Sequence, residues 1–124
     1  MPTFASVCLI TADVPRLRAF YAAVLRVTPE GDNTFTTFAL PGAGLALFGE
    51  DDMERMAAGS TRGAGRGACV LELRVDDVDD EHRRLLALGA EIVKPPTTQP
   101  WGSRSVWFRD PDGNLINFFA RVGE

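Results

Sequence analysis

The chain has 124 residues, of which 45% are hydrophobic and 24% charged, and its formal net charge is −4. This length suits one domain with a buried core, and the acidic balance argues against a nucleic-acid-binding surface, which is usually basic. No apolar run approaches the roughly 18 residues that a membrane span requires, and the first residues do not resemble a signal peptide. We therefore expect a cytoplasmic protein with no nucleic-acid or membrane partner.

The first half begins with a strand-like run at residues 4–11. Asp13 follows as a candidate helix N-cap, and Pro15 falls in the first turn of that helix. The next apolar side chains recur with helical spacing: Leu17, Phe20, Tyr21, Val24 and Leu25. Two further strand-like runs, residues 34–40 and 45–48, complete this half.

The second half has the same order of elements. Residues 69–75 form a strand-like run, and three acidic residues then crowd a helix start, where carboxylates favour the helix dipole: Asp76, Asp77 and Asp79. An apolar helix face is expected from Leu85, Leu86 and Leu88, with Gly89 as the stop. Residues 90–93 begin another strand, which Pro95 and Pro96 are expected to break.

The sequence Asp110-Pro111-Asp112-Gly113-Asn114 is typical of a tight turn. It predicts a β-hairpin over residues 104–119. Val14 and Val78 stand at equivalent points, 64 residues apart (78 − 14). The sequence therefore predicts an α+β fold of two duplicated βαβββ modules, at about residues 4–49 and 69–121 of a single domain that spans 1–124.

The two modules are joined by a predicted linker at residues 50–68. Its first part, residues 51–58, is compatible with a short helix, and its second part, residues 59–67, is rich in glycine. The cysteines Cys8 and Cys69 form no CxxC pair and are expected to be buried apolar side chains. His82, the only histidine, is expected on the surface of a charged helix start.

Several segments together resemble the vicinal oxygen chelate superfamily, which includes glyoxalase I, extradiol dioxygenases, fosfomycin-resistance transferases and bleomycin-resistance proteins. They are Thr11-Ala12-Asp13-Val14 with Phe20-Tyr21, Leu73-Arg74-Val75-Asp76-Asp77-Val78, Leu88-Gly89-Ala90, Trp101-Gly102-Ser103-Arg104 and the Asp110–Asn114 turn. The resemblance implies a cupped, partly open mixed β-sheet with the helices outside, often completed in a homodimer.

Metal-dependent members of that superfamily bind one divalent ion through His, Glu and Gln side chains. The corresponding positions here match Ser6, Leu47, Val70 and Asn117, with the second uncertain by one residue. A Ser–Leu–Val–Asn set cannot hold a catalytic zinc, nickel or iron. We therefore expect no metal and no cofactor, and the resemblance is to the metal-free, bleomycin-resistance-like branch.

Strand alternation predicts which side chains line the cup. The first strand would contribute Phe4, Ser6 and Cys8, and the second module would add Val70, Glu72, Arg74, Ser105, Trp107, Asn117 and Phe119. Trp101 would overhang the mouth, and Arg104 would anchor an anionic group or bond the nearby turn. The indole rings favour a planar aromatic ligand, and core or dimer packing is the alternative use of these rings.

Three functions are compatible with these residues. The first is metal-independent binding that sequesters a planar antibiotic or metabolite without catalysis. The second is an enzyme (a lyase, isomerase or dioxygenase) with a displaced metal site or with Glu72 as a general base, although an ion pair is the other role for Glu72. The third is a non-catalytic dimeric interaction or regulatory domain. Function depends on the site rather than the fold, so the fold alone does not decide among them.

Overall fold

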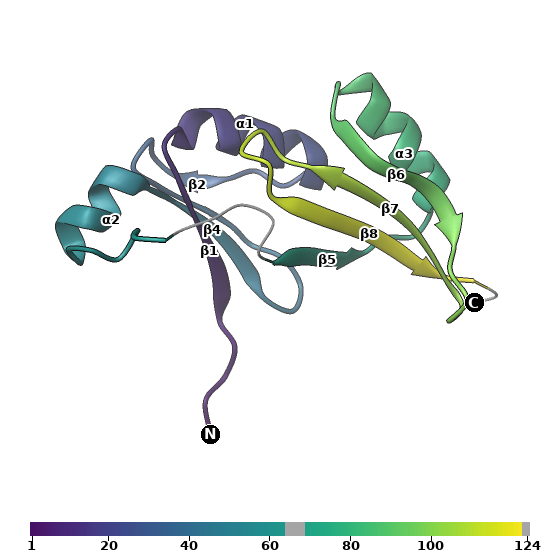
Figure 1. Cartoon of the computed structure of the whole chain (residues 1–124), viewed down its shortest axis with the longest axis horizontal. Coiled ribbons are helices and arrows are strands. Elements are labelled where there is room, and N and C mark those ends of the chain that lie inside the picture. Colours follow the sequence, from purple (N-terminus) through teal and green to yellow (C-terminus); the bar gives the residue numbers. More distant parts are fainter. Residues whose placement is uncertain (64–68, 123–124) are drawn as a thin grey trace. The chain divides into compact units, whose positions relative to one another are not determined.

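The computed structural model describes residues 1–63 and 69–122 and divides the chain into two compact units, Met1–Ala64 and Gly65–Glu124. Each unit contains a four-stranded sheet (Figure 1). Among the described residues, no helix is long and apolar enough to cross a membrane.

The first unit carries one sheet in the order β1-β4-β3-β2. Its strands β1 and β4 are parallel, and the other neighbours are antiparallel. The elements are β1 (Ser6–Thr11), α1 (Val14–Leu25), β2 (Glu30–Gly31), β3 (Phe35–Phe38), β4 (Gly44–Gly49) and α2 (Glu50–Met56). The strand β2, two residues long, was not identified in the sequence.

The second unit repeats this topology with the order β5-β8-β7-β6. Again the first and last strands are the parallel pair. The elements are β5 (Val70–Arg74), α3 (Val78–Ala87), β6 (Glu91–Thr98), β7 (Ser103–Arg109) and β8 (Leu115–Arg121). The predicted α+β fold of two βαβββ modules is therefore confirmed.

Equivalent aspartates begin the main helix of each unit. The Asp13 side chain accepts a hydrogen bond from the Arg16 backbone N–H (3.1 Å), and the Asp77 side chain accepts one from the Asp80 N–H (3.0 Å). Each bond satisfies a backbone donor that the helix itself leaves unpaired. Asp13 lies two residues after the end of β1 and Asp77 three residues after the end of β5, so each fixes the start of the helix that follows its strand.

Each helix packs its apolar stripe on one face of its own sheet. In the first unit, Leu17 and Tyr21 are buried with Phe38, whose ring centroid lies 6.3 Å from that of Tyr21. In the described part of the second unit, the buried hydrophobic side chains are Val78, Leu85, Val106, Phe108, Ile116 and Phe118. Burial of each large apolar side chain contributes about 1.5–3 kcal/mol, which fixes the face of the sheet that the helix covers.

The turn before β8 is held by one buried carboxylate. Asp110 accepts hydrogen bonds from the backbone N–H groups of Asp112 and Asn114 (both 2.9 Å) and from the Asn114 side-chain amide (2.8 Å). Gly113 has a positive φ of 90°, a conformation that L side chains rarely adopt. The predicted hairpin is confirmed, and its register carries Asn117 directly opposite Trp107.

Some local predictions were wrong. The strand β6 continues through Pro95 and Pro96, because it is the edge strand and its register shifts at these residues, so the missing N–H groups remove no bond from the ladder. In α3, only Leu85 of the three predicted leucines is buried, while Leu86 and Leu88 are exposed.

The cysteine prediction was also wrong. Cys8 and Cys69 are both exposed free thiols rather than buried side chains. Cys8 lies on β1 beside Ala46, on the face away from the helix, so its position in a strand does not bury it. In the linker, the predicted short helix corresponds to α2, and residues 64–68 lie outside the described residues.

Candidate functional site

The second sheet has one face that α3 does not cover, which we call the distal face. The opposite, helix-covered face is identified by Arg104 of β7, which donates to both carboxylate oxygens of Asp79 on α3 (2.9 Å each). Side chains alternate along a strand, so the neighbours of Arg104 in β7, Ser105 and Ser103, lie on the distal face. The same alternation places Asn117 on the distal face, because its sequence neighbours Ile116 and Phe118 point into the core on the helix side.

Strand register arranges the distal face in two neighbouring rows, which we call the central row and the flanking row. From β6 to β5, the central row is Lys94, Trp107, Asn117 and Glu72. In the same order, the flanking row is Thr97, Ser105, Phe119 and Arg74. Directly opposed side chains on neighbouring strands are about 4.5–5.5 Å apart at Cβ, so members of one row can share a ligand.

The centre of this face is an amide–carboxylate pair. The Asn117 side-chain N–H donates to Glu72 Oε2 at 3.1 Å. Asn117 is only 4% exposed, and its Oδ1 atom is buried without a hydrogen-bond partner among the described residues. The carboxylate can only accept, so the amide must turn its nitrogen to Glu72 and its oxygen away. The pair therefore presents an acceptor that lacks a donor.

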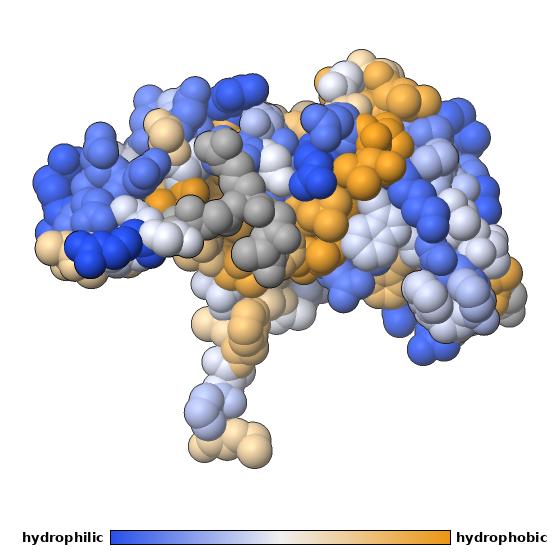
Figure 2. Space-filling model, in the orientation of Figure 1, coloured by the Kyte–Doolittle hydropathy of each residue, from blue (hydrophilic) through white to orange (hydrophobic). Residues whose placement is uncertain are grey.

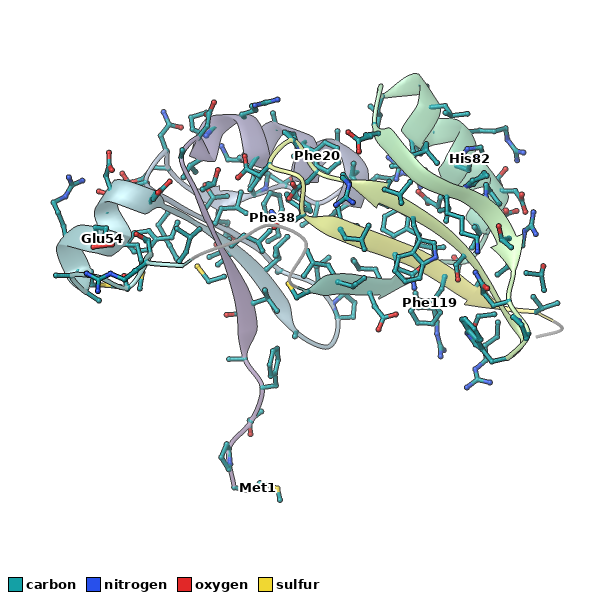
Figure 3. The ribbon with its side chains drawn as sticks, viewed as in Figure 1. Met1, Phe20, Phe38, Glu54, His82 and Phe119 are labelled. Carbon is teal, nitrogen blue, oxygen red and sulfur yellow. The ribbon has the colours of Figure 1, made fainter. Side chains whose placement is uncertain are left out.

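Aromatic rings flank the pair. Trp107 precedes Asn117 in the central row, Phe119 lies beside Ser105 in the flanking row, and both rings are partly buried. Figure 2 shows hydrophobic residues among hydrophilic ones over β7 and β8, and Figure 3 places Phe119 on β8 and His82 on a separate element, α3. Such rings supply apolar area for a flat ligand at little conformational cost.

Two cations complete the rows. Arg74 and Lys94 are exposed, and neither has an ion-pair partner among the residues that the structure describes. Glu72, which is also exposed, is the one carboxylate of the two rows. Glu72 accepts a hydrogen bond from the Asn117 amide, and no ion pair joins it to another residue that the structure describes. The cross-dimer ion pair that the sequence offered as an alternative stays a prediction.

The structure brings together most of the predicted ligand-binding residues of the second module. Val70 lies on the distal face two residues from Glu72 and is 39% exposed. Trp101 lies outside the rows, on the loop between β6 and β7, and is 70% exposed. Arg104 is separated from the others by the sheet, because its guanidinium binds Asp79 on the helix side.

This ion pair also has an electrostatic signature. The hydrogen bond from Arg104 holds the pKa of Asp79 below its usual value and raises that of Arg104 itself. The guanidinium also donates to the Thr98 hydroxyl at 3.2 Å. Arg104 thus links α3 to β7 and to the end of β6, and its guanidinium lies on the helix side of the sheet rather than on the distal face.

Lys94 and Thr97 belong to the rows but were not identified from the sequence. The two prolines between them indicated a broken strand, so no face was assigned to residues beyond 93. The alternation of side chains could not have assigned Lys94 and Thr97 to the distal face, because the register of β6 shifts on both sides of Lys94.

In the first unit, the face of the sheet away from α1 carries Ser6 and Cys8 of β1, while Phe4 precedes the strand and is exposed. Leu47 does not lie there. It pairs with Leu9 and is fully buried on the helix side, so the matching position on the distal side is Ala46 or Phe48. Of the positions within one residue of the predicted match, Leu47 is therefore the one that does not lie on the distal side of the sheet.

The donor set does not fit a divalent metal ion. On the distal side of their sheets, the family positions offer a hydroxyl (Ser6), an alkyl group (Val70) and an amide (Asn117), and Leu47 or its neighbours add none. Among the described residues, no three His, Cys, Asp or Glu side chains are grouped so that they could bind a metal. A catalytic metal needs several nitrogen, sulfur or carboxylate ligands on one centre.

A cavity of about 210 Å³ lies in the first unit at the start of α1 and α2, and its lining includes Thr11, Asp13, Asn33 and Asp52. These groups already have partners within the unit. Thr11 accepts from the Asp13 N–H, Asn33 accepts from Arg18, and Asp52 is paired with Arg55. The cavity is thus lined by groups that cap and connect elements.

Comparison with known proteins shows which family and which folds the chain resembles. Residues 3–118 match the profile of the Glyoxalase/Bleomycin resistance protein/Dioxygenase superfamily. A curated relative, the uncharacterized protein YraH of Bacillus subtilis (strain 168), is 33% identical over 64 residues, which is 51% of this chain and 50% of that protein. The match thus spans about half the length of the curated relative.

Solved structures are similar over nearly the whole chain. A glyoxalase/bleomycin resistance protein/dioxygenase from Nocardioides is 28% identical with a TM-score of 0.80, covering 99% of this chain and 85% of that one. A family enzyme from Burkholderia phytofirmans PsJN is 18% identical with a TM-score of 0.85, over 95% and 98%. A lactoylglutathione lyase from Agrobacterium tumefaciens is 24% identical with a TM-score of 0.77, over 96% and 93%. The last two support the fold alone.

Proposed function

Because the chain belongs to the Glyoxalase/Bleomycin resistance protein/Dioxygenase superfamily, we propose that it is a metal-independent small-molecule-binding protein. Its ligand is a planar aromatic antibiotic or metabolite held on the distal face of the second sheet. The protein acts by sequestration, so the ligand leaves chemically unchanged.

One observation carries this proposal: Trp107 and Phe119 flank the Asn117–Glu72 pair on adjoining strands. Small-molecule sites combine apolar and aromatic surface with a few placed polar groups, as this face does. Loss of the metal-ligating side chains at the family positions leaves binding, rather than metal-assisted chemistry, as the use of this face.

The proposal is tested by titrating planar aromatic compounds against intrinsic tryptophan fluorescence, followed by recovery and mass analysis of the ligand. Trp107→Leu is expected to weaken binding about tenfold, since an aromatic pair contributes about 0.5–1.5 kcal/mol beyond its buried area. Because this change removes the fluorescent reporter, the affinities of the variants are compared by isothermal titration calorimetry. Trp101→Leu is the matched comparison, because that ring is exposed outside the rows. Equal losses in the two variants would contradict a site centred on Trp107.

Native mass spectrometry of protein grown with zinc, nickel and iron, and purified without chelators, tests metal independence. We expect a metal-free homodimer, the assembly that the sequence resemblance implied. One metal ion per chain would overturn the metal-free proposal. A metal-free monomer would contradict the dimer while leaving the site on the second sheet in place.

The second candidate is an enzyme that uses Glu72 as its base, which is favoured by the presence of this one carboxylate in the central row. It predicts a chemically altered ligand and loss of turnover in Glu72→Gln. Sequestration predicts that the ligand is recovered unchanged from the parent protein. The third candidate, a dimeric interaction domain, predicts that no planar compound changes the fluorescence of Trp107.

A further inference from the structure

The buried oxygen of Asn117 constrains the chemistry of the ligand. An Oδ1 atom that is removed from water and has no donor costs about 1–3 kcal/mol, and native proteins seldom leave such groups unpaired. Asn117 is more than nine-tenths buried, and no described residue donates to this atom. Among the described residues, therefore, no group supplies the N–H or O–H that this oxygen lacks.

Resting on the proposed function, we infer that the ligand is a planar compound carrying an N–H donor, such as an amino-substituted heteroaromatic ring, and that this donor binds Asn117 Oδ1. Because Oδ1 is closed to solvent in the free chain, the ligand reaches it by displacing a side chain that covers the amide. The ring then lies against Trp107, the neighbour of Asn117 in the central row. Glu72 acts as the positioning residue: by accepting from the amide nitrogen, it fixes the amide so that its oxygen faces the donor.

A metal cation does not fit the same place. The described acceptors at this point are one amide oxygen and one carboxylate that already accepts from the amide, whereas hard cations take six or more oxygen ligands. The two rows also hold the cations Arg74 and Lys94, which have no ion-pair partners among the described residues and repel a positively charged ligand. A neutral ring with an N–H group satisfies Oδ1 without adding positive charge.

A water molecule is the other donor that could reach Oδ1, and two probes of matched shape separate the possibilities. The ring 2-aminobenzothiazole carries an exocyclic amino donor, and 2-methylbenzothiazole replaces that group by a methyl group of similar size. A ligand that satisfies Oδ1 must discriminate between them, whereas an oxygen already satisfied by water gains nothing from the amino group.

The experiment measures both dissociation constants by quenching of Trp107 in a Trp101→Phe background. We expect the amino probe to bind at least tenfold more tightly than the methyl probe, as one hydrogen bond to a buried acceptor provides. In Asn117→Leu, which removes the acceptor with little change of volume, the two probes should bind equally. Glu72→Ala removes the acceptor for the amide nitrogen and should reduce the discrimination between the probes. Glu91→Ala is its matched control, because Glu91 is exposed and paired with Arg109 (3.3 Å), away from the amide.

The outcomes separate the two proposals. Equal binding of both probes by the parent protein overturns the donor inference and leaves the proposed function intact. If neither probe changes the Trp107 fluorescence at millimolar concentration, both the proposed function and the inference are overturned. If Glu72→Ala and Glu91→Ala discriminate between the probes equally well, the positioning role of Glu72 is wrong, although the donor inference stands.

Discussion

Replacement of Asn117 by leucine should make the protein more stable while weakening its site. The amide lies in β8 between two core residues and is 4% exposed, but only its nitrogen has a partner. Leucine has nearly the same volume and no polar atoms. Residues that bind a ligand are often not the most stable choice for the fold, so replacing them can stabilise the protein while it loses function.

The size of the effect follows from three contributions. Removal of the unpaired Oδ1 relieves about 1–3 kcal/mol, and loss of the bond to Glu72, whose carboxylate is exposed, costs about 0.5–1.5 kcal/mol. The leucine side chain gains part of the roughly 1.5–3 kcal/mol of full apolar burial, because only its buried portion replaces polar surface. We expect a net stabilisation of about 1–2 kcal/mol, or roughly 3–8 °C in the midpoint of thermal unfolding for a chain of this size.

Urea denaturation followed by Trp107 fluorescence, in the Trp101→Phe background, measures this change in the unit that contains it. Glu72→Gln is the control, because glutamine still offers an oxygen to the Asn117 amide and should alter stability by less than about 0.5 kcal/mol. If Asn117→Leu lowers the free energy of unfolding by more than about 1 kcal/mol, Oδ1 is satisfied in the free protein, and the reasoning from an unpaired acceptor fails.

Three other changes test the fold around the site. The ring of Phe108 is fully buried, and its centroid lies 4.9 Å from that of Phe118. Phe108→Ala should therefore lower the free energy of unfolding, measured by urea titration, by about 3–5 kcal/mol. A loss below about 1 kcal/mol would contradict a closely packed core. Arg104→Gln should raise the pKa of Asp79 toward its usual value, because it removes the bidentate bond; an unchanged carboxylate titration by NMR would refute this.

The third change concerns Glu54, whose pKa is lowered by hydrogen bonds from the Thr61 hydroxyl (2.5 Å) and from the backbone amides of Gly59 and Thr61. A lowered folded-state pKa gives stability that is complete above the unfolded-state pKa, near 4.3, and is lost as the pH falls through the folded-state value. The protection factor of the Thr61 amide, which is its exchange rate relative to the intrinsic rate at the same pH, should therefore decrease in acid in the parent protein. In Glu54→Gln this acid dependence should disappear, and its persistence would argue against the carboxylate as its cause.

Helix starts and strand faces were predictable wherever the sequence carries a clear local signal. Asp13 and Asp77 cap helices because their side chains bond the first turn, and this chemistry is local. Glu72, Asn117 and Trp107 were assigned to one face correctly, because each alternates with apolar neighbours that pack under the helix.

Prediction failed where the alternation of side chains along a strand was ambiguous, or where the face that it indicates was not taken into account. The strand β4 reads Leu45-Ala46-Leu47-Phe48, which is apolar on both faces, so period two cannot show that Leu47 lies under the helix. Arg104 was included as a possible ligand anchor although it alternates with Ser105 and Trp107 and therefore had to lie on the opposite face. Its partner Asp79 is 25 residues away, and such a pairing is set by tertiary packing.

Strand order was another property that the sequence did not contain. Nothing local to Pro95 and Pro96 shows that their strand lies at the edge of its sheet, where proline is tolerated. The environment of Asn117 Oδ1 is likewise set by tertiary packing rather than by the local sequence. The amide itself was identified, but that its oxygen lacks a donor follows only from the coordinates.

The two prolines of β6 also affect how this protein behaves at high concentration. An exposed strand edge is a template on which other chains can add strands, and such growth leads to aggregates. Pro95 and Pro96 offer no N–H to an incoming strand, and register shifts interrupt the regular pairing around Lys94. These features make β6 the less favourable of the two edges of the second sheet for strand addition, and β5 the more favourable one.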